Sequence, residues 1–546
     1  MDVTDGQNQQ IGWSLRKMPV FAVDEQHGRW RVCTRHDGER TVLNARCSSR
    51  DSTSFTPETV MVRLTRISSL NLAHIAWPAA EAGGAAILAI LSSFVVARVV
   101  GPAEVGIAAT VVSVHVLLWV VVNALFADAV VQRADIDHGA LSGAFWASTA
   151  IGIAMMAVQA ASGWGLAWLL DDDRLPAMAM TLAVSLPLVG GAGVVQGILT
   201  RNRAFRWVAL RTLIGNGVGT CFGIVASIHG LGAWAIVGQQ AVSSCLGAAI
   251  LIVCAGWSPA CVFCWSSVRS LLRVGLPLTA GTLVLLARYR VFAILLGATA
   301  GAAALGQVHI AFRLVDTVRD ISFTALWRLF LPDLARHQHD QAAMLACVDR
   351  LLRLSSLIML PLCGALAVSL VPFVALALGP EWREAGQAAI PLVALMAALA
   401  VTFPSGVALV AAGQPQLPLY ANLAALIATS VGVMAWPPQT APEAIAIWCI
   451  SQILVIPYGA RASARALGVG PLRPLREAVP MALLTGLAVV LSLAIPDRLG
   501  LATTPVRQIG WQLAVGGAVV GGGLLLRFAH LRGRIPAWPS IGPVRK

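Results

Sequence analysis

Lysine is almost missing from this 546-residue chain, and charge of either sign is scarce. The two lysines, Lys17 and Lys546, lie near the ends of the chain, and charged residues make up only 12% of it. No GxxxxGK(S/T) sequence occurs, so we expect no phosphate-binding loop of that type and no ATP hydrolysis. So little charge cannot cover the surface of a soluble protein of this length.

Hydrophobic residues instead make up 57% of the chain, and the mean hydropathy is +0.75. Apolar runs of about 20 residues, the length that crosses a bilayer, recur from residue 70 to residue 528. The sequence therefore predicts an all-α polytopic membrane protein with about fourteen transmembrane helices. We expect them at 70–98, 105–127, 141–170, 176–199, 207–228, 232–255, 272–297, 303–328, 352–378, 385–411, 417–436, 441–462, 478–495 and 508–527.

The arginines support this list because they alternate between connections. Connections of one alternating set carry most of the arginines, as at 201–206 and 461–476. The connections of the other set are acidic or nearly uncharged, as at 101–104 and 171–174, and only Asp497, Arg498 and Arg507 depart from this pattern. Cytoplasmic loops carry the excess of basic residues in membrane proteins. We therefore expect both termini in the cytoplasm and the protein in the inner membrane of a bacterium.

The chain also repeats itself, because small-residue hinges at Gly106 and Gly306 each join two apolar helices. Parallel repeats of this kind are typical of transporters with a central cavity. We expect two six-helix bundles and two appended helices. The predicted parts are a polar, disordered cytoplasmic tail at 1–66, bundles at 67–257 and 258–470, appended helices at 471–530 and a basic cytoplasmic tail at 531–546.

Metal and nucleic-acid sites are not indicated. Cys261 and Cys264 have CxxC spacing, but no second pair or nearby histidine completes a metal or redox site. The net charge of +13 comes from arginines at helix ends rather than from one basic face. We expect no metal, no cofactor and no nucleic-acid partner.

Six short segments resemble one family in their order along the chain. They are Trp77 with Glu81, then 97–106, 129–133, 271–277, 303–315 and 330–336. Over residues 70–470 the chain resembles the polysaccharide-transport branch, with the Wzx-type flippases, of the multidrug/oligosaccharidyl-lipid/polysaccharide flippase superfamily. It departs from the family at 287–291, where members often carry an acidic residue and this chain has Arg288 and Arg290.

The resemblance implies a function. The chain is expected to move an undecaprenyl-linked oligosaccharide from the cytoplasmic to the periplasmic leaflet for exopolysaccharide or O-antigen (lipopolysaccharide) synthesis, without catalysing a reaction. Membrane lipid, a polysaccharide polymerase and export proteins are the implied partners. The alternatives are a drug or cation antiporter of the same superfamily and a membrane polysaccharide polymerase or ligase, although the short periplasmic connections argue against an enzyme.

Charges inside predicted spans mark the expected transport pathway, because they are costly unless they face water or a partner. Arg288 and Arg290 lie in one predicted helix and Arg313, Asp316 and Asp320 in the next, with Arg319 expected to point elsewhere. With a turn near residue 300, Arg288 and Arg313 are expected at the same depth. We predict that these groups line the cavity and bind phosphate; the other interpretation is that Arg313, Asp316 and Asp320 only neutralise one another.

Further charged residues have two interpretations each. Glu81 is expected either to titrate or bind a cation in the cavity, or to pair with an arginine across the bundle. Arg201, Arg203 and Arg206 either meet pyrophosphate on the cytoplasmic side or only fix topology. Arg133 is a further candidate for the entry site, with a topological anchor as the alternative.

Overall fold

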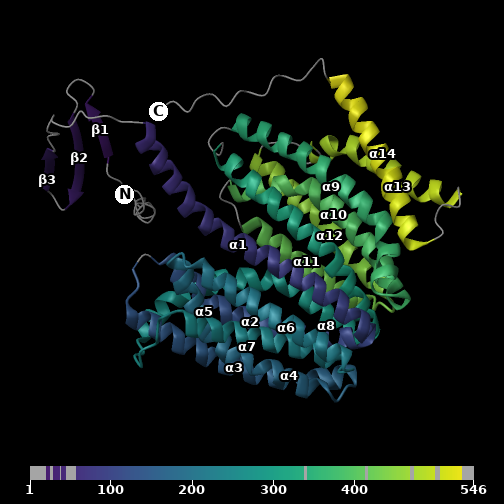
Figure 1. Cartoon of the computed structure of the whole chain (residues 1–546), viewed down its shortest axis with the longest axis horizontal. Coiled ribbons are helices and arrows are strands. Elements are labelled where there is room, and N and C mark those ends of the chain that lie inside the picture. The colour runs from purple at the N-terminus through teal and green to yellow at the C-terminus, as the bar shows by residue number, and fades with distance from the viewer. Residues whose placement is uncertain are drawn as a thin grey trace, which may run out of the picture. The chain divides into compact units, whose positions relative to one another are not determined.

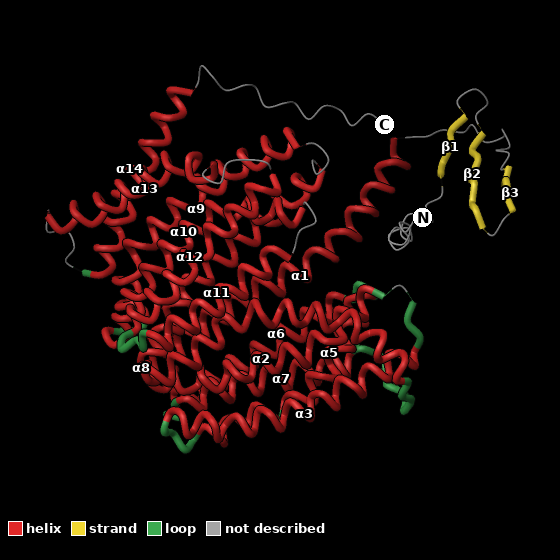
Figure 2. The backbone as a smooth tube through the Cα atoms, turned by 180° about the vertical axis from the view of Figure 1, so that it is seen from behind, coloured by secondary structure: helices red, strands yellow, loops and turns green. Residues whose placement is uncertain are grey.

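The computed structural model describes residues 20–24, 29–36, 39–44, 57–133, 135–336, 341–411, 416–467, 473–498 and 504–531. Two compact units divide the chain, Met1–Ala73 and His74–Lys546. The first holds a small sheet and the start of one helix, and the second is built from helices alone where it is described. Figures 1 and 2 show the course of the chain.

The first unit contains a three-stranded antiparallel sheet of β1 (Val20–Asp24), β2 (Arg29–His36) and β3 (Glu39–Asn44) in that order. In the register, Val20 lies opposite Cys33 and Cys33 opposite Val42. Arginines alternate with apolar residues over 29–32 at the start of β2, the period of a strand. The structure thus describes strands, and the beginning of α1 at Pro57, within the segment that the sequence predicts to be a disordered tail.

Seven helices make up the first half of the membrane region. They are α1 (Pro57–Val100), α2 (Pro102–Gln132), α3 (His138–Leu170), α4 (Leu175–Ala183), α5 (Ser185–Arg201), α6 (Phe205–Ile228) and α7 (Ala233–Cys254). The span expected at 176–199 is interrupted at Val184. Pro187 explains the break, because it has no N–H to donate to the carbonyl of residue 183.

The expected turn near residue 300 is confirmed. Helix α8 runs over Trp265–Arg336 but passes through Gly301 with φ 82° and ψ 173°, where it reverses. The two arms lie side by side, since the Tyr289 and Phe312 rings are 4.8 Å apart. Each arm is long enough to span a bilayer, so α8 forms the two helices expected at 272–297 and 303–328.

The second half continues with α9 (Gln341–Ala377), the 3-10 turn η1 (Pro380–Trp382), α10 (Arg383–Ala411), α11 (Gln416–Ala435) and α12 (Ala441–Leu467). Figure 1 shows α2–α7 in one group and α9–α12 in another, with α8 against both. The last helices, α13 (Arg473–Arg498) and α14 (Pro505–Leu531), pack on α9. They match the two helices expected at 478–495 and 508–527, while the predicted division into two bundles and two appended helices stays a prediction.

Twelve of the described helical segments are long and apolar enough to span a membrane. One of them, Trp265–Thr324, contains both arms of α8. The apolar part of α11, Leu419–Ala435, is shorter and is not counted among the twelve. The all-α polytopic class is confirmed, whereas a count of fourteen spans stays a prediction.

The repeat is visible in the backbone at two glycine turns. Gly101 and Gly301 have φ angles of 85° and 82°, and each is followed five residues later by another glycine. Those glycines, Gly106 and Gly306, meet: a Cβ on Gly106 would stand 1.7 Å from the Ala302 carbonyl oxygen. The small residues that suggested hinges therefore allow α2 and α8 to touch backbone to backbone.

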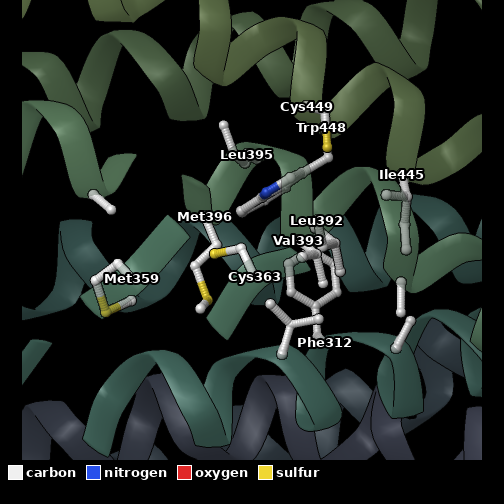
Figure 3. Packing of buried hydrophobic residues seen from close by; sticks show 14 of the residues in the cluster. Phe312, Met359, Cys363, Leu392, Val393, Leu395, Met396, Ile445, Trp448 and Cys449 are labelled. Carbon is white, nitrogen blue, oxygen red and sulfur yellow. The ribbon is translucent and has the colours of Figure 1, made fainter. Parts of the chain in front are cut away.

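The core of the second half forms around α8. Trp448 points from α12 toward Phe312 on α8, with ring centroids 5.1 Å apart and nearly perpendicular planes (Figure 3). Phe292 on the other arm of α8 lies 5.1 Å from the same indole. These aromatic contacts hold both arms of α8 in fixed positions against α12.

Candidate functional site

The acidic groups of α8 pair with a residue that the sequence analysis placed elsewhere. Arg319 Nη1 lies 2.7 Å from Asp316 Oδ1, and Arg319 Nη2 lies 3.0 Å from Asp320 Oδ1. The prediction that Arg319 points away from this face is wrong, because its long side chain reaches both carboxylates. The two carboxylates thus pair directly with Arg319, while Arg313 interacts with them electrostatically at longer range.

Arg288 extends from α8 toward α11 and α12. Its guanidinium donates hydrogen bonds to Asn422 Oδ1 and Gln452 Oε1, and it lies 5.5 Å from the centroid of the Trp448 ring. Neutral amide oxygens and an aromatic face therefore hold the cation. Its Nε is buried and finds no partner among the described residues.

Arg313 extends from the other arm of α8 toward α1, where its Nε donates to Ser93 Oγ at 3.2 Å. Between the two arms, Tyr289 Oη and His309 Nδ1 are 2.8 Å apart. Arg290 lies 5.2 Å from the Tyr289 ring centroid. Because Tyr289 contacts both His309 and Phe312, residues on either side of Gly301 lie at similar depth, as the sequence predicted for Arg288 and Arg313.

Three arginines at this site have no direct ion pair among the described residues, although Asp316 interacts electrostatically with each of them at longer range. Within the described part of the chain, no carboxylate lies within 4.0 Å of Arg288, Arg290 or Arg313, whereas Arg319 has two. All three are partly buried in membrane-spanning helices, where an unpaired charge is costly. An anionic group such as phosphate would supply the missing partner. That these residues and the two aspartates line a cavity stays a prediction.

Glu81 lies in a polar cavity of about 380 Å³ in the first half. Its carboxylate accepts a hydrogen bond of 2.7 Å from Thr212 Oγ1, and Arg211 lines the same cavity and donates to Gln196 Oε1. Glu81 and Arg211 interact electrostatically but form no direct ion pair. Glu81 thus faces a cavity and has an arginine nearby, so a role in the cavity and an interaction with an arginine both stay predictions.

The arginines expected at the cytoplasmic entry are only partly brought together. Arg201 donates to the carbonyl oxygen of Arg133, and Arg133 Nη1 donates to Ser270 Oγ on α8 at 2.6 Å. Arg206 lies over the Trp207 ring at 5.1 Å, and Arg203 is exposed with φ 57°. Arg133 and Arg201 therefore join α2, α5 and α8 at one end of the molecule.

At the opposite end, Glu104 of the 97–106 segment joins three connections. Arg174 lies 3.0 Å from Glu104 and 2.9 Å from Asp172, while Glu104 accepts from the Ala233 amide at 2.7 Å. Hydrogen bonding to Arg174 lowers the pKa of the Asp172 carboxyl. Hydrogen bonds to Asp172 and Glu104 in turn raise the pKa of the Arg174 guanidinium. Asp172 thus fixes the loop between α3 and α4 through its contacts with Arg174.

A second cavity, of about 450 Å³, lies between α9, α13 and α14. Apolar residues and glycines dominate its lining, and Thr485, Ser492 and Gln512 are the polar members. An apolar cavity between membrane helices suits a hydrocarbon chain.

Sequence reasoning missed the polar partners of the charged groups. Asn422, Gln452 and Arg211 all lie inside apolar runs, and a polar residue within such a run is the signal that identifies them. Ser93 and Tyr289 carry no such signal, because hydroxyls and aromatic residues are common in membrane helices. His309 does carry one, as a titratable residue inside an apolar run.

Comparison with known proteins finds a matching family model and a curated relative. A family model described as "Polysaccharide biosynthesis protein" matches residues 95–387. The succinoglycan biosynthesis transport protein ExoT of Rhizobium meliloti (strain 1021) is 20% identical over 312 residues, which cover 57% of this chain and 63% of ExoT. The chain therefore spans less than two thirds of the length of this curated relative.

Two solved structures share the fold. The lipid II flippase MurJ, in an inward closed conformation, aligns with a TM-score of 0.68 and 12% identity over 84% of this chain and 100% of MurJ. An inward-facing multidrug resistance MATE family transporter of the MOP superfamily aligns with a TM-score of 0.52 and 13% identity over 70% of this chain and 95% of that one. At such identities the likeness shows the fold alone.

Proposed function

The chain belongs to the polysaccharide biosynthesis protein family within the multidrug/oligosaccharidyl-lipid/polysaccharide flippase superfamily, and we propose that it moves a lipid-linked oligosaccharide across the membrane. The proposed cargo is an undecaprenyl-type phosphate or pyrophosphate carrying a short sugar chain. The proposed direction is from the cytoplasmic to the periplasmic leaflet of the inner membrane, by alternating access of the two bundles and without catalysis.

One observation carries this proposal: the four arginines Arg288, Arg290, Arg313 and Arg319 outnumber the two carboxylates beside them, Asp316 and Asp320, and the first three have no direct ion pair with a described residue inside the membrane-spanning helices. A phosphate or pyrophosphate group is the part of the cargo that hydrocarbon excludes most strongly, and guanidinium groups bind it bidentately. The apolar cavity beside α13 and α14 supports the same assignment, since a polyprenyl chain needs an apolar surface. An antiporter for organic cations would need the opposite charge.

Translocation in proteoliposomes tests the proposal. Labelled undecaprenyl-pyrophosphate oligosaccharide is placed in the outer leaflet, and its appearance in the inner leaflet is followed for the native chain, Arg288→Gln and Arg313→Gln. Loss of one charge-assisted contact is worth about 1.5–3 kcal/mol, so each variant should be slower by roughly 10- to 150-fold. Arg174→Gln, at an exposed ion pair, is the matched control and should keep the native rate.

A native chain that moves no lipid-linked sugar but exchanges organic cations for protons would replace the proposal with the antiporter. The polymerase or ligase alternative predicts a change in sugar chain length, which the same samples show by mass spectrometry. Polysaccharide polymerases and export proteins are the proposed partners, because they would take up the translocated unit.

A further inference from the structure

The polar cavity of the first half is not explained by phosphate binding. Helices α1, α2, α5, α6 and α7 line it, and its volume of about 380 Å³ falls in the range of roughly 300–1,000 Å³ that is usual for small-molecule sites. Its charged members, Glu81 and Arg211, have opposite signs. The cavity therefore lacks the excess positive charge that an anionic ligand requires.

Neutral hydrogen-bonding groups dominate the cavity. Four helices each contribute one or more of these side chains: Asn123, Gln196, Asn216, Gln240, Ser243 and Ser244. Each amide offers two donors and an acceptor, and each hydroxyl offers both. Within the described part of the chain, no hydrogen bond engages the side-chain amides of Asn123 and Asn216. A ligand with many hydroxyl groups, such as a sugar ring, has the complementary chemistry.

Trp119 adds an aromatic surface to this lining. It lies one helical turn before Asn123 on α2, so both side chains face the same side of the helix. An indole offers a flat apolar face with one polar edge. Paired with amides, it fits a sugar ring, which is apolar on the face of its C–H bonds and polar around its edge.

Close helix packing fixes one wall of the cavity. A Cβ on Gly219 would stand 2.0 Å from Ser243 Oγ and 2.8 Å from the Gln239 carbonyl oxygen, so α6 and α7 are in direct contact there. Ser92 on α1 donates to Gln239 Oε1 at 2.7 Å. These contacts fix α1, α6 and α7 against one another before a ligand arrives, which reduces the entropy lost on binding.

Helix α1 connects this cavity to the arginine site. Glu81 lines the cavity, and Ser93, twelve residues later, accepts the hydrogen bond from Arg313. At 1.5 Å per residue the two positions are roughly 18 Å apart along the helix. A single sugar phosphate is too short to reach both, whereas a chain of several sugars can.

We propose that this cavity binds an uncharged sugar ring of the oligosaccharide, while the phosphate is held at Arg288, Arg290 and Arg313. The proposal rests on the proposed function and adds a second, sugar-specific contact to it. Selection of the cargo would then depend on the amide side chains, because a site built to bind hydroxyl groups rejects ligands that lack them.

Two probes separate the sugar contact from the phosphate contact: undecaprenyl pyrophosphate alone, and undecaprenyl pyrophosphate carrying a neutral hexose tetrasaccharide. Their Kd values are measured for the full chain in nanodiscs, for Asn216→Leu and Gln240→Leu, and for Gln508→Leu on α14 as the matched control. Only variants whose Tm equals that of the native chain are compared. Each cavity variant should bind the glycolipid about threefold to tenfold more weakly and leave the sugar-free probe unchanged.

The possible results differ for the two proposals. If the native chain binds both probes and the cavity variants match it, the sugar site is refuted and the proposed function stands. Equal weakening for both probes also refutes a sugar-specific role. If the native chain binds neither probe, the proposed function fails, and the sugar site fails with it.

Discussion

Replacing Gly306 by alanine should separate α2 from α8. In the native chain, a Cβ at this position would stand 1.9 Å from the Pro102 carbonyl oxygen and 2.8 Å from its carbon. Ordinary van der Waals contact begins at 3.4 Å, so the added methyl group is about 1.5 Å too close. The obstructing atoms belong to the backbone, and no side-chain rotation relieves the clash.

The free-energy cost of the Gly306→Ala substitution follows from this geometry. Overpacking by one methyl group destabilises an arrangement by about 1–3 kcal/mol. If a conformation with α2 and α8 apart at this point exists, as alternating access requires, the same free energy shifts the equilibrium toward it by roughly 5- to 150-fold. The variant should therefore populate the separated conformation and transport more slowly, because one of the two end states has become costly.

Electron paramagnetic resonance distances measure this shift directly. Spin labels at Ala103 and Ala303, both exposed positions beside the contact, report the separation of α2 and α8 in a background without the native cysteines. Gly281→Ala is the control on the same helix, where a Cβ meets no atom within 4 Å. A Gly306→Ala distribution that coincides with those of the native and control chains would show that the contact is not part of the transition.

Three further outcomes follow from individual contacts. Asp172→Asn should lower the free energy of unfolding by about 0.2–1 kcal/mol above pH 4. Because the pKa of Asp172 is lower in the folded state than in the unfolded state, this difference between native chain and variant should disappear as the pH falls through the folded-state pKa. Thermal unfolding at several pH values measures it. Hydrogen bonds from Ser266 and the following residue lower the pKa of Cys264 to about 7, so its alkylation rate should reach half-maximum near that pH and Ser266→Ala should move the midpoint upward. Gln307→Leu should lower Tm because it leaves the amide of the buried Ala385, in the first turn of α10, without its hydrogen-bond acceptor, at about 1–3 kcal/mol; Gln508→Leu is the unaffected control.

Much of the candidate site could be predicted, but not its pairings. The charges at Arg288 and Arg313 and the turn between them follow from their positions in apolar runs. The pairing of Arg319 with Asp316 and Asp320 could not be read from helical angles, because a long side chain reaches beyond the direction of its Cα–Cβ bond. The amide partners Asn422 and Gln452 come from helices more than a hundred residues away, which spacing along the chain does not reveal.

The sequence by itself determined the class of protein, the positions of nearly all helices and the glycine pairs of the repeat. Each of these is local: a run of apolar residues must form a helix in lipid, since no water is present to satisfy its backbone. Only the tertiary structure decided that Gly106 and Gly306 touch, that Glu81 and Arg211 share a cavity, and that three arginines lack a carboxylate partner within the described chain. These facts depend on which helix faces are brought together, and that is fixed by packing between distant segments rather than by any one of them.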